Sequence, residues 1–199
     1  MQAGIKTFTA LITALLLLAG VFGVYYHTKP AVIRGGGPET PMTAFARQFQ
    51  DFRNYADSVP PPLKDIALFD MQDQKHSLLE AKGRWLVVNF WAVWCAPCVK
   101  EIPTLEAMRQ QFADKSFDVV YISLDYPPNA AFLKASMDRL KIPSIKTYYA
   151  ADETVWDVYN ITALPMSLVV NPDGAIMYRA LGDADWSSKE VTDFINSLL

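Results

Sequence analysis

The sequence predicts an α/β fold in which a central mixed β-sheet is flanked by helices, preceded by a transmembrane helix at the N-terminus. Three observations support this prediction. Short apolar runs typical of buried strands alternate with helix-like segments over residues 60–199. The turn signal Asn171-Pro172-Asp173-Gly174 separates two of those runs and indicates a hairpin. The chain also begins with an uncharged stretch, Phe8–Tyr26, which is long enough for a membrane span.

Residues 1–29 are the predicted membrane segment. A helix needs roughly 20 apolar residues to cross a bilayer, and Phe8–Tyr26 supplies them, with the interfacial pair Tyr25-Tyr26 at its far end. We therefore expect an uncleaved single-pass anchor. A cleaved signal peptide is the alternative, because Ala19 and Gly20 are small enough for a cleavage site. The short N-terminal tail favours export of the residues that follow the anchor.

Residues 30–59 are predicted to link the anchor to the domain. Gly35-Gly36-Gly37, with prolines on both sides, is typical of a flexible spacer. A short amphipathic helix is expected next, with Thr40 as its N-cap and Pro41 as its first residue. Its apolar stripe is expected to dock on the domain, and binding to a partner protein is the alternative. The stripe consists of Phe45, Phe49 and Phe52.

Residues 60–199 are predicted to fold as one domain. Two short strands are expected at Ile66–Phe69 and near Lys75–Leu78, on either side of a polar turn. The continuous apolar run Trp85–Trp91 indicates a strand that is buried on both faces. A helix from Pro97 to about Phe112 follows that strand directly.

The second half of the domain continues the alternation of strands and helices. Runs rich in β-branched and aromatic residues predict the strands, and apolar residues at helical spacing predict the helices. The expected strands are Phe117–Leu124, Thr147–Ala150, Met166–Val170 and Ala175–Leu181, and the expected helices are Pro128–Leu140, Glu153–Tyr159 and Ser187–Leu198.

The composition fits a globular domain with an appendage. Hydrophobic residues make up 51% of the chain and aromatic residues 13%, which is ample material for a core. The net charge of −3 gives no indication of binding to nucleic acid.

The two cysteines of the chain, Cys95 and Cys98, are separated by two residues and stand where a predicted strand meets a predicted helix. Thiols at this spacing can close into a disulfide and reopen. A helix N-terminus carries partial positive charge, which favours the thiolate over the thiol. The pair therefore indicates thiol–disulfide chemistry, whereas two inert buried cysteines would be the plainer interpretation.

The stretch Phe90-Trp91-Ala92-Val93-Trp94-Cys95-Ala96-Pro97-Cys98 resembles the active site of thioredoxin-fold proteins. Its continuation, Val99-Lys100-Glu101-Ile102-Pro103, resembles the membrane-tethered TlpA/ResA/DsbE-like branch of those proteins. The segment Tyr159–Pro165 looks like the one that leads to the cis-proline of the family, and Asn171–Gly174 resembles the turn after the next strand. The similarity covers roughly residues 60–199. It implies a thioredoxin-like fold and a thiol–disulfide oxidoreductase.

The resemblance assigns roles to the catalytic side chains. Cys95 is expected to attack a substrate disulfide, because it opens the motif and is expected to be the more exposed thiol. Cys98 is expected to resolve the mixed disulfide. Thioredoxins carry a buried Asp where this chain has Asn89, so Glu101 is the candidate for moving the Cys98 proton, with a solvated helix Glu as the plainer interpretation.

The expected substrate contacts surround the two thiols. A cis Pro165 would bring the backbone of Leu164 and Pro165 against Cys95, where it could bind an extended substrate segment. The exposed edge of the motif supplies Trp94, Ala96 and Pro97. No metal and no cofactor is expected beyond the Cys95–Cys98 disulfide itself.

Paired cysteines also serve functions other than disulfide exchange. A zinc site usually takes four ligands, and the chain offers His27 and His76 as the only histidines. A copper(I) site on the two thiolates, in a copper-binding assembly factor, remains an alternative. Peroxiredoxins share the fold but place Pro and Thr or Ser shortly before the reactive Cys, where this chain has bulky apolar residues.

The function expected from the sequence is an extracytoplasmic thiol–disulfide oxidoreductase, held in the cytoplasmic (inner) membrane with its domain facing the periplasm or the cell exterior. By resemblance it would reduce oxidised cysteines in exported proteins such as apocytochrome c or other metalloprotein precursors. A membrane thiol reductase would supply the electrons. The alternative is an oxidase or isomerase that introduces disulfides with the same motif, since the dipeptide Ala96-Pro97 does not determine the direction.

Overall fold

The computed structural model describes residues 31–32, 39–126 and 128–199. The expected membrane anchor, the triple-glycine spacer and His27 lie outside these residues. Within the described ranges, no helix is both long and apolar enough to cross a bilayer. The chain divides into two compact units, residues 1–31 and 32–199, and the second unit contains the predicted domain.

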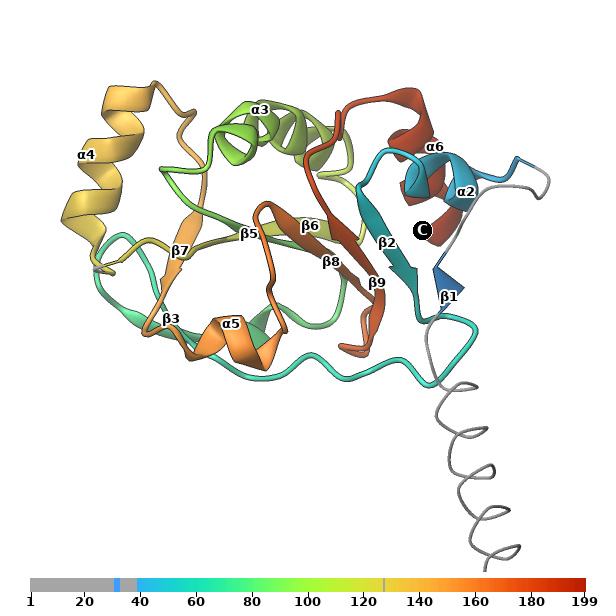
Figure 1. The fold of residues 1–199 in the computed structure, drawn as a ribbon, viewed down its shortest axis with the longest axis horizontal. Helices are drawn as coiled ribbons and strands as arrows, with labels where there is room; N and C mark the ends of the chain where they lie inside the picture. Colours follow the sequence, from blue (N-terminus) through green and yellow to red (C-terminus); the bar gives the residue numbers. More distant parts are fainter. Residues whose placement is uncertain (1–30, 33–38, 127) are drawn as a thin grey trace, which may run out of the picture. The chain divides into compact units, whose positions relative to one another are not determined.

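The second unit is built on a mixed β-sheet, as predicted (Figure 1). Strands β5, β6 and β7 run parallel to one another. The remaining pairs are antiparallel, namely β2 with β9, β9 with β8, β8 with β5, β7 with β3, and β3 with β4. A two-residue strand, β1, covers Ala31–Val32. From β2 onward the order across the sheet is β2 (Asp51–Asn54), β9 (Ile176–Leu181), β8 (Met166–Val170), β5 (Trp85–Trp91), β6 (Phe117–Ser123), β7 (Thr147–Ala150), β3 (Ala67–Phe69) and β4 (Lys75–Ser77).

Helices cover both faces of this sheet and enclose two hydrophobic clusters (Figure 1). The larger cluster lies beneath four helices: α2 (Pro41–Ala46), α3 (Ala96–Gln111), α4 (Ala130–Leu140) and α6 (Lys189–Leu198). The other lies beneath α5 (Thr154–Val158) and the 3-10 helix η1 (Leu78–Ala81). Strand β5 faces both clusters, because Val87 packs into the first and Val88 into the second.

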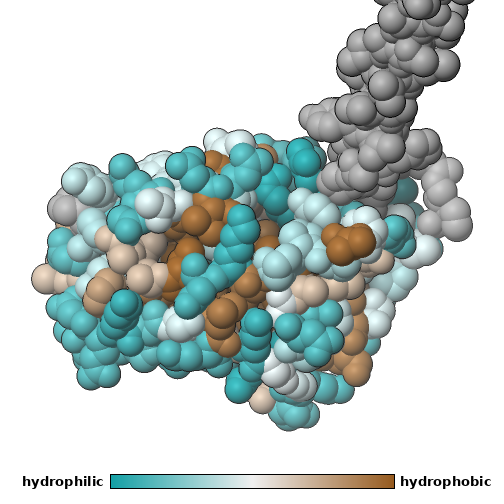
Figure 2. Space-filling view, turned by 90° about the horizontal axis from the view of Figure 1, so that it is seen from below, coloured by the Kyte–Doolittle hydropathy of each residue, from teal (hydrophilic) through white to brown (hydrophobic). Residues whose placement is uncertain are grey.

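The face of the sheet beneath α5 is covered by two short elements, α5 and η1. Seen from that side, hydrophobic side chains show between hydrophilic ones (Figure 2). A cavity of about 340 Å³ lies on this face, with Leu68, Leu86 and Val120 among its apolar walls and Arg84 and Lys146 among its charged ones.

The elements expected after residue 60 are all present, with ends that shift by two residues or fewer. The expected helix before them is shorter than predicted. Helix α2 begins after the N-cap Thr40, as expected, but it ends at Ala46. The chain then turns, and Phe52 lies in β2, opposite Ala180 of β9.

The phenylalanine stripe nevertheless docks on the domain, as expected. Phe45 stacks on Phe194 of α6 with ring centroids 4.1 Å apart, and Phe52 packs against Tyr178 of β9 at 5.7 Å. A continuous helix and a short helix followed by a turn and a strand both bring these three rings together. The spacing of the phenylalanines alone therefore could not distinguish the two structures. The backbone pairing of β2 with β9 decides in favour of the strand.

Candidate active site

The junction between β5 and α3 carries the two cysteines. Strand β5 is apolar on both faces and occupies the middle of the sheet, so its end is held by β6 on one side and β8 on the other. Cys95 is the N-cap of α3, and the Cys98 amide donates to its Sγ at 3.3 Å. An N–H of the first helical turn has no carbonyl partner within the helix, and when it points at this sulfur it favours the thiolate form of Cys95.

Cys95 and Cys98 form a disulfide with their Cα atoms 5.3 Å apart. Cys95 keeps 5% of its surface exposed and Cys98 none, so the expected order of exposure is confirmed. Trp94 is 64% exposed beside them. Ala96 and Pro97, between the cysteines, are also exposed, so the rim of the disulfide is open to a partner molecule.

The cis peptide bond expected at Leu164–Pro165 is present. Met166, the next residue, begins β8 and pairs with Phe90 near the end of β5. This register places Pro165 at the same end of the sheet as the cysteine junction. Leu164 is half-buried and Pro165 is buried. The expected substrate-contacting residues therefore come from two neighbouring segments, the start of α3 and the start of β8.

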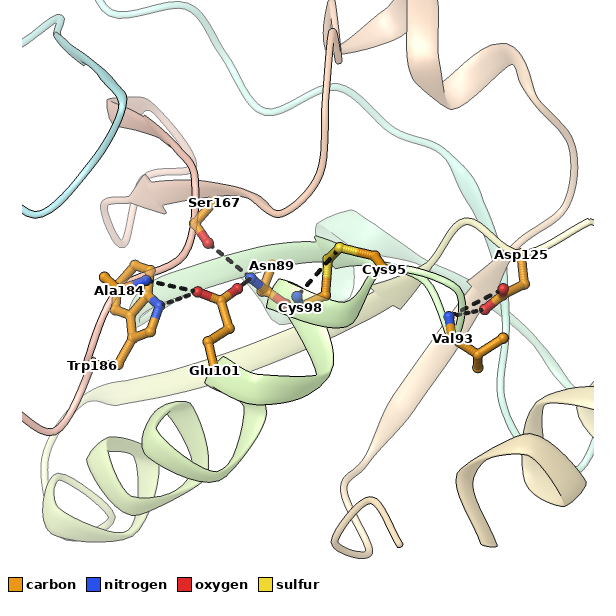
Figure 3. The surroundings of a disulfide bond; sticks show 9 residues. All are labelled: Asn89, Val93, Cys95, Cys98, Glu101, Asp125, Ser167, Ala184 and Trp186. Carbon is orange, nitrogen blue, oxygen red and sulfur yellow. Dashed lines mark hydrogen bonds between the residues drawn. A yellow bond between two sulfur atoms is a disulfide. The ribbon is translucent and has the colours of Figure 1, made fainter. Parts of the chain in front are cut away.

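Glu101 lies one turn after Cys98 on α3 and is buried, with 2% of its surface exposed (Figure 3). Its Oε1 accepts a hydrogen bond from Asn89 Nδ2 at 2.9 Å. Its Oε2 accepts from Trp186 Nε1 at 2.9 Å and from the Ala184 amide at 3.3 Å. The interpretation of Glu101 as an ordinary solvated helix residue is therefore wrong.

Burial raises the pKa of Glu101 from 4.5 to about 7. The hydrogen bonds from Trp186, Asn89 and Ala184 act in the opposite direction, because they favour the carboxylate. The negative charge of Asp183 adds a smaller upward contribution. A carboxyl with this pKa exchanges a proton readily near neutral pH, which is the property required of a general acid or base.

Asn89 plays a part that the sequence did not reveal. Besides Glu101, its Nδ2 donates to Ser167 Oγ at 2.9 Å, so its amide links β5, α3 and β8. Its Oδ1 is buried without a hydrogen-bond partner among the described residues. In the sequence, Asn89 marked only the lack of the thioredoxin Asp and so pointed to Glu101. The structure adds that the Asn89 amide orients the Glu101 carboxyl.

Asp125 is a second residue that sequence reasoning missed. It is 6% exposed, and its carboxylate accepts from the Val93 amide at 3.1 and 3.2 Å (Figure 3). The carboxylate also accepts from Ser123 Oγ at 2.8 Å. Burial raises the pKa of Asp125. Because Val93 precedes Cys95 by two residues, Asp125 fixes the loop that presents the attacking thiol. An Asp immediately after a strand end was the available signal.

Trp186 was also missed, although a lone Trp between polar residues of the segment Asp183–Ser187 could have drawn attention to it. Trp91, by contrast, is completely buried as the sequence predicted. Its indole Nε1 donates to Thr147 Oγ1 at 3.2 Å.

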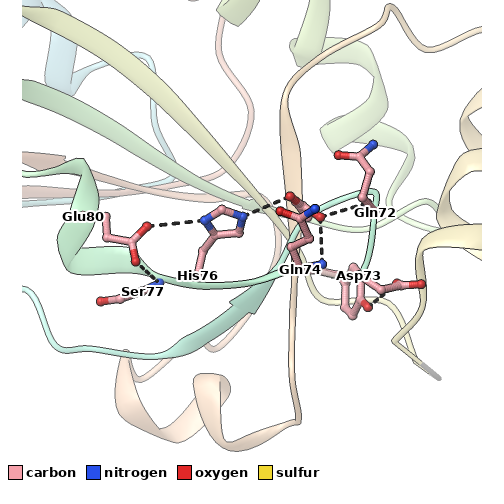
Figure 4. Close-up of polar contacts among 8 residues, drawn as sticks. Gln72, Asp73, Gln74, His76, Ser77 and Glu80 are labelled. Carbon is pink, nitrogen blue, oxygen red and sulfur yellow. Dashed lines mark hydrogen bonds and ion pairs between the residues drawn. The ribbon is translucent and has the colours of Figure 1, made fainter.

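His76 stands apart from the cysteines. It lies on β4, which is separated from β5 by β6, β7 and β3 in the sheet. Its Nδ1 contacts Glu80 Oε2 at 3.4 Å (Figure 4). Its Nε2 contacts Asp70 Oδ2 at 3.0 Å. Within the described ranges, no group of three His, Cys, Asp or Glu side chains is arranged to hold a metal ion.

Comparison with known proteins gives concordant matches. Residues 59–179 match the AhpC/TSA family. The thiol-disulfide oxidoreductase ResA of Bacillus thuringiensis (strain Al Hakam) is 26% identical over 121 residues, which cover 60% of this chain and 67% of the relative. ResA of Bacillus subtilis (strain 168) is 24% identical over 132 residues, or 66% and 71% of the two chains.

Solved structures share the fold. A protein assigned as the thiol:disulfide interchange protein DsbE of Chlorobium tepidum superposes with a TM-score of 0.62 at 19% identity, over 71% of this chain and 97% of the other. StoA of Bacillus subtilis superposes with a TM-score of 0.54 at 21% identity, over 66% and 99%. At these identities the two likenesses support the thioredoxin-like fold alone.

Proposed function

This chain belongs to the AhpC/TSA family and is a thiol–disulfide oxidoreductase of the ResA/DsbE type, and we propose that it reduces disulfides in exported proteins. The observation that carries the proposal is the Cys95–Cys98 disulfide at the N-terminus of α3, in which Cys95 is the N-cap and the more exposed of the two residues.

The reaction begins from the reduced dithiol. The Cys95 thiolate attacks one sulfur of the substrate disulfide, and the other substrate sulfur leaves as a thiolate and takes up a proton. The Cys98 thiolate then attacks Cys95 Sγ in the mixed disulfide. This attack forms the Cys95–Cys98 disulfide and releases the second substrate sulfur. Two electrons have passed from the dithiol to the substrate, and each substrate sulfur ends as a thiol.

Glu101 is proposed to manage the proton of Cys98. It is one helical turn away and is buried on the same side of α3, and its pKa of about 7 lets it accept a proton near neutral pH. Removing the proton from Cys98 produces the thiolate that resolves the mixed disulfide. Asn89 holds the carboxyl in place for this step.

The open rim is proposed to bind the substrate. The exposed side chains of Trp94, Ala96 and Pro97 offer an apolar surface around the disulfide. The backbone of Leu164 and Pro165, at the start of β8, is proposed to bind an extended segment of the substrate beside Cys95.

The proposed setting is the outer side of the cytoplasmic membrane. Residues 1–29 would anchor the chain there, as their apolar sequence predicts. The substrates would be oxidised cysteines of apocytochrome c or other metalloprotein precursors. A membrane thiol reductase would return the Cys95–Cys98 disulfide to the dithiol after each turnover.

The direction of the reaction is tested by the reduction potential of the Cys95–Cys98 pair, measured in the full chain against defined thiol buffers. A potential more negative than about −200 mV supports a dedicated reductant, because oxidising members of this chemistry lie near −120 mV. A less negative potential would make the chain an oxidase or isomerase. A Cys95→Ser chain is the control that must give no redox transition.

A further inference from the structure

The Glu101 carboxyl is enclosed by a loop that follows β9. In this loop the Ala184 amide and Trp186 Nε1 both donate to Oε2, at 3.3 and 2.9 Å. The loop is itself tied to α3, because the Trp186 amide donates to Thr104 Oγ1 at 3.1 Å. Thr104 stands three residues after Glu101, so the donors and the acceptor are fixed to the same helix.

The indole of Trp186 is completely buried and is held from behind by aromatic rings of the N-terminal segment 41–54. Phe45 and Phe49 lie 5.8 and 5.4 Å from it, measured between ring centroids. Hydrogen bonds from the backbone and from a side chain fasten this segment to the two ends of the same loop, at the last residue of β9 and at the N-cap of α6. The Gln50 amide donates to the Leu181 carbonyl at 2.9 Å, and Gln48 Nε2 donates to Ser188 Oγ at 2.9 Å.

Both the loop and its support lie outside the part of the chain that matches the family. That match ends at residue 179, before Ala184 and Trp186, and begins at residue 59, after the segment 41–54. The enclosure of Oε2 therefore uses residues on both sides of the part of the chain that matches the family model.

We propose that Trp186 is a positioning residue for the redox reaction: it holds the Glu101 carboxyl in the orientation in which that group exchanges a proton with the cysteines. The segment 41–54 in turn holds Trp186 in place. The inference rests on the proposed role of Glu101. If that role holds, the segment 41–54 contributes to the redox site through its support of Trp186.

The proposal has a direct electrostatic consequence. A hydrogen bond donated to an ionised carboxylate favours the charged form, so its loss favours the protonated form. The negative charge of Asp183 also acts on Glu101 and opposes its ionisation, and Asp183 itself pairs with the exposed Lys100 at 3.4 Å. The cysteines become a further source of negative charge when reduced. Because Trp186→Phe removes a donor and leaves these charges in place, the pKa of Glu101 should rise by about one pH unit.

The test is the pH dependence of the Cys95–Cys98 reduction potential in the full chain, from pH 5 to 9. The wild type should show a change of slope where Glu101 titrates, and Glu101→Gln should remove it. In Trp186→Phe the change of slope should move upward by about one pH unit. Trp156→Phe, on α5 beneath the opposite face of the sheet, is the matched control and should leave it unchanged.

A folded Trp186→Phe chain whose change of slope stays at the wild-type pH would overturn the proposal. If Trp186→Phe fails to fold, Phe49→Leu is measured in its place. The pH at which the slope changes should then rise by a smaller amount, and an unchanged pH would count against the proposal. Different results would contradict the proposed function. A wild-type slope that survives in Glu101→Gln removes the role of Glu101, and an oxidising potential removes the reductant direction without affecting the shift.

Discussion

Replacing Glu101 with Gln should make the folded chain more resistant to rising pH. In the wild type, burial raises the pKa of Glu101 from 4.5 in the free side chain to about 7. The folded state therefore holds the proton more tightly than the unfolded state does. The contribution of protonated Glu101 to the stability of the folded state is complete below pH 4.5 and is lost as the pH rises through 7.

The size of the effect follows from that shift. One pH unit corresponds to about 1.4 kcal/mol, so ionising the buried Glu101 costs the folded state roughly 3 kcal/mol by pH 8. Gln has nearly the same shape and no charge to bury. Its amide can be accommodated if Asn89 turns over, because the unpartnered Oδ1 would then accept from it.

The assay is urea unfolding of the oxidised full chain at pH 5, 6, 7 and 8. The difference in unfolding free energy between Glu101→Gln and the wild type should grow by roughly 2.5 kcal/mol over this range. Glu190→Gln, an exposed glutamate of α6, is the matched control and should show no such growth. Parallel pH profiles for Glu101→Gln and the wild type would refute the reasoning that burial dominates at this site.

Three further outcomes follow from the contacts described above. Cys98→Ser should trap the mixed disulfide on Cys95, visible as a covalent adduct on a non-reducing gel with an oxidised substrate peptide; turnover without an adduct would count against the proposed order of attack. Asp125→Ala should cost about 1–3 kcal/mol in urea unfolding and slow the attack, because the buried Val93 amide loses its acceptor; an unchanged rate would show that the loop needs no support. Phe45→Ala should lower the unfolding free energy by about 3–5 kcal/mol, because it empties a completely buried site; a loss under about 1 kcal/mol would indicate that α2 does not contribute to the core.

The sequence predicted the domain well because its elements are marked by local chemistry. Trp85–Trp91 is apolar almost without interruption, and only a central strand buried on both faces suits such a run. Ser188 caps α6 and Asn129 caps α4, so these helices begin within two residues of the expected positions. The cysteine pair at the strand–helix junction is likewise a local pattern, which is why the position of the site could be predicted from the sequence.

The missed features depend on contacts between segments distant in sequence. The i, i+4, i+7 spacing of Phe45, Phe49 and Phe52 fits a helix, and only pairing with β9 shows that the last of them lies in a strand. The surroundings of Glu101 could not be predicted for the same reason. Trp186 reaches it across 85 positions of sequence, and a local pattern contains no information on such a contact.

The placement of β2 against β9 also bears on how copies of this chain behave when crowded. A sheet edge with unpaired backbone groups is a template on which a second molecule can add a strand. Strand β2 occupies that position along β9 from Tyr178 to Leu181. At the other side of the sheet, β4 is only three residues long and begins with Lys75, and short charged edges resist such addition. Deleting residues 41–54 would expose the backbone groups of β9 and favour edge-to-edge addition of a second molecule.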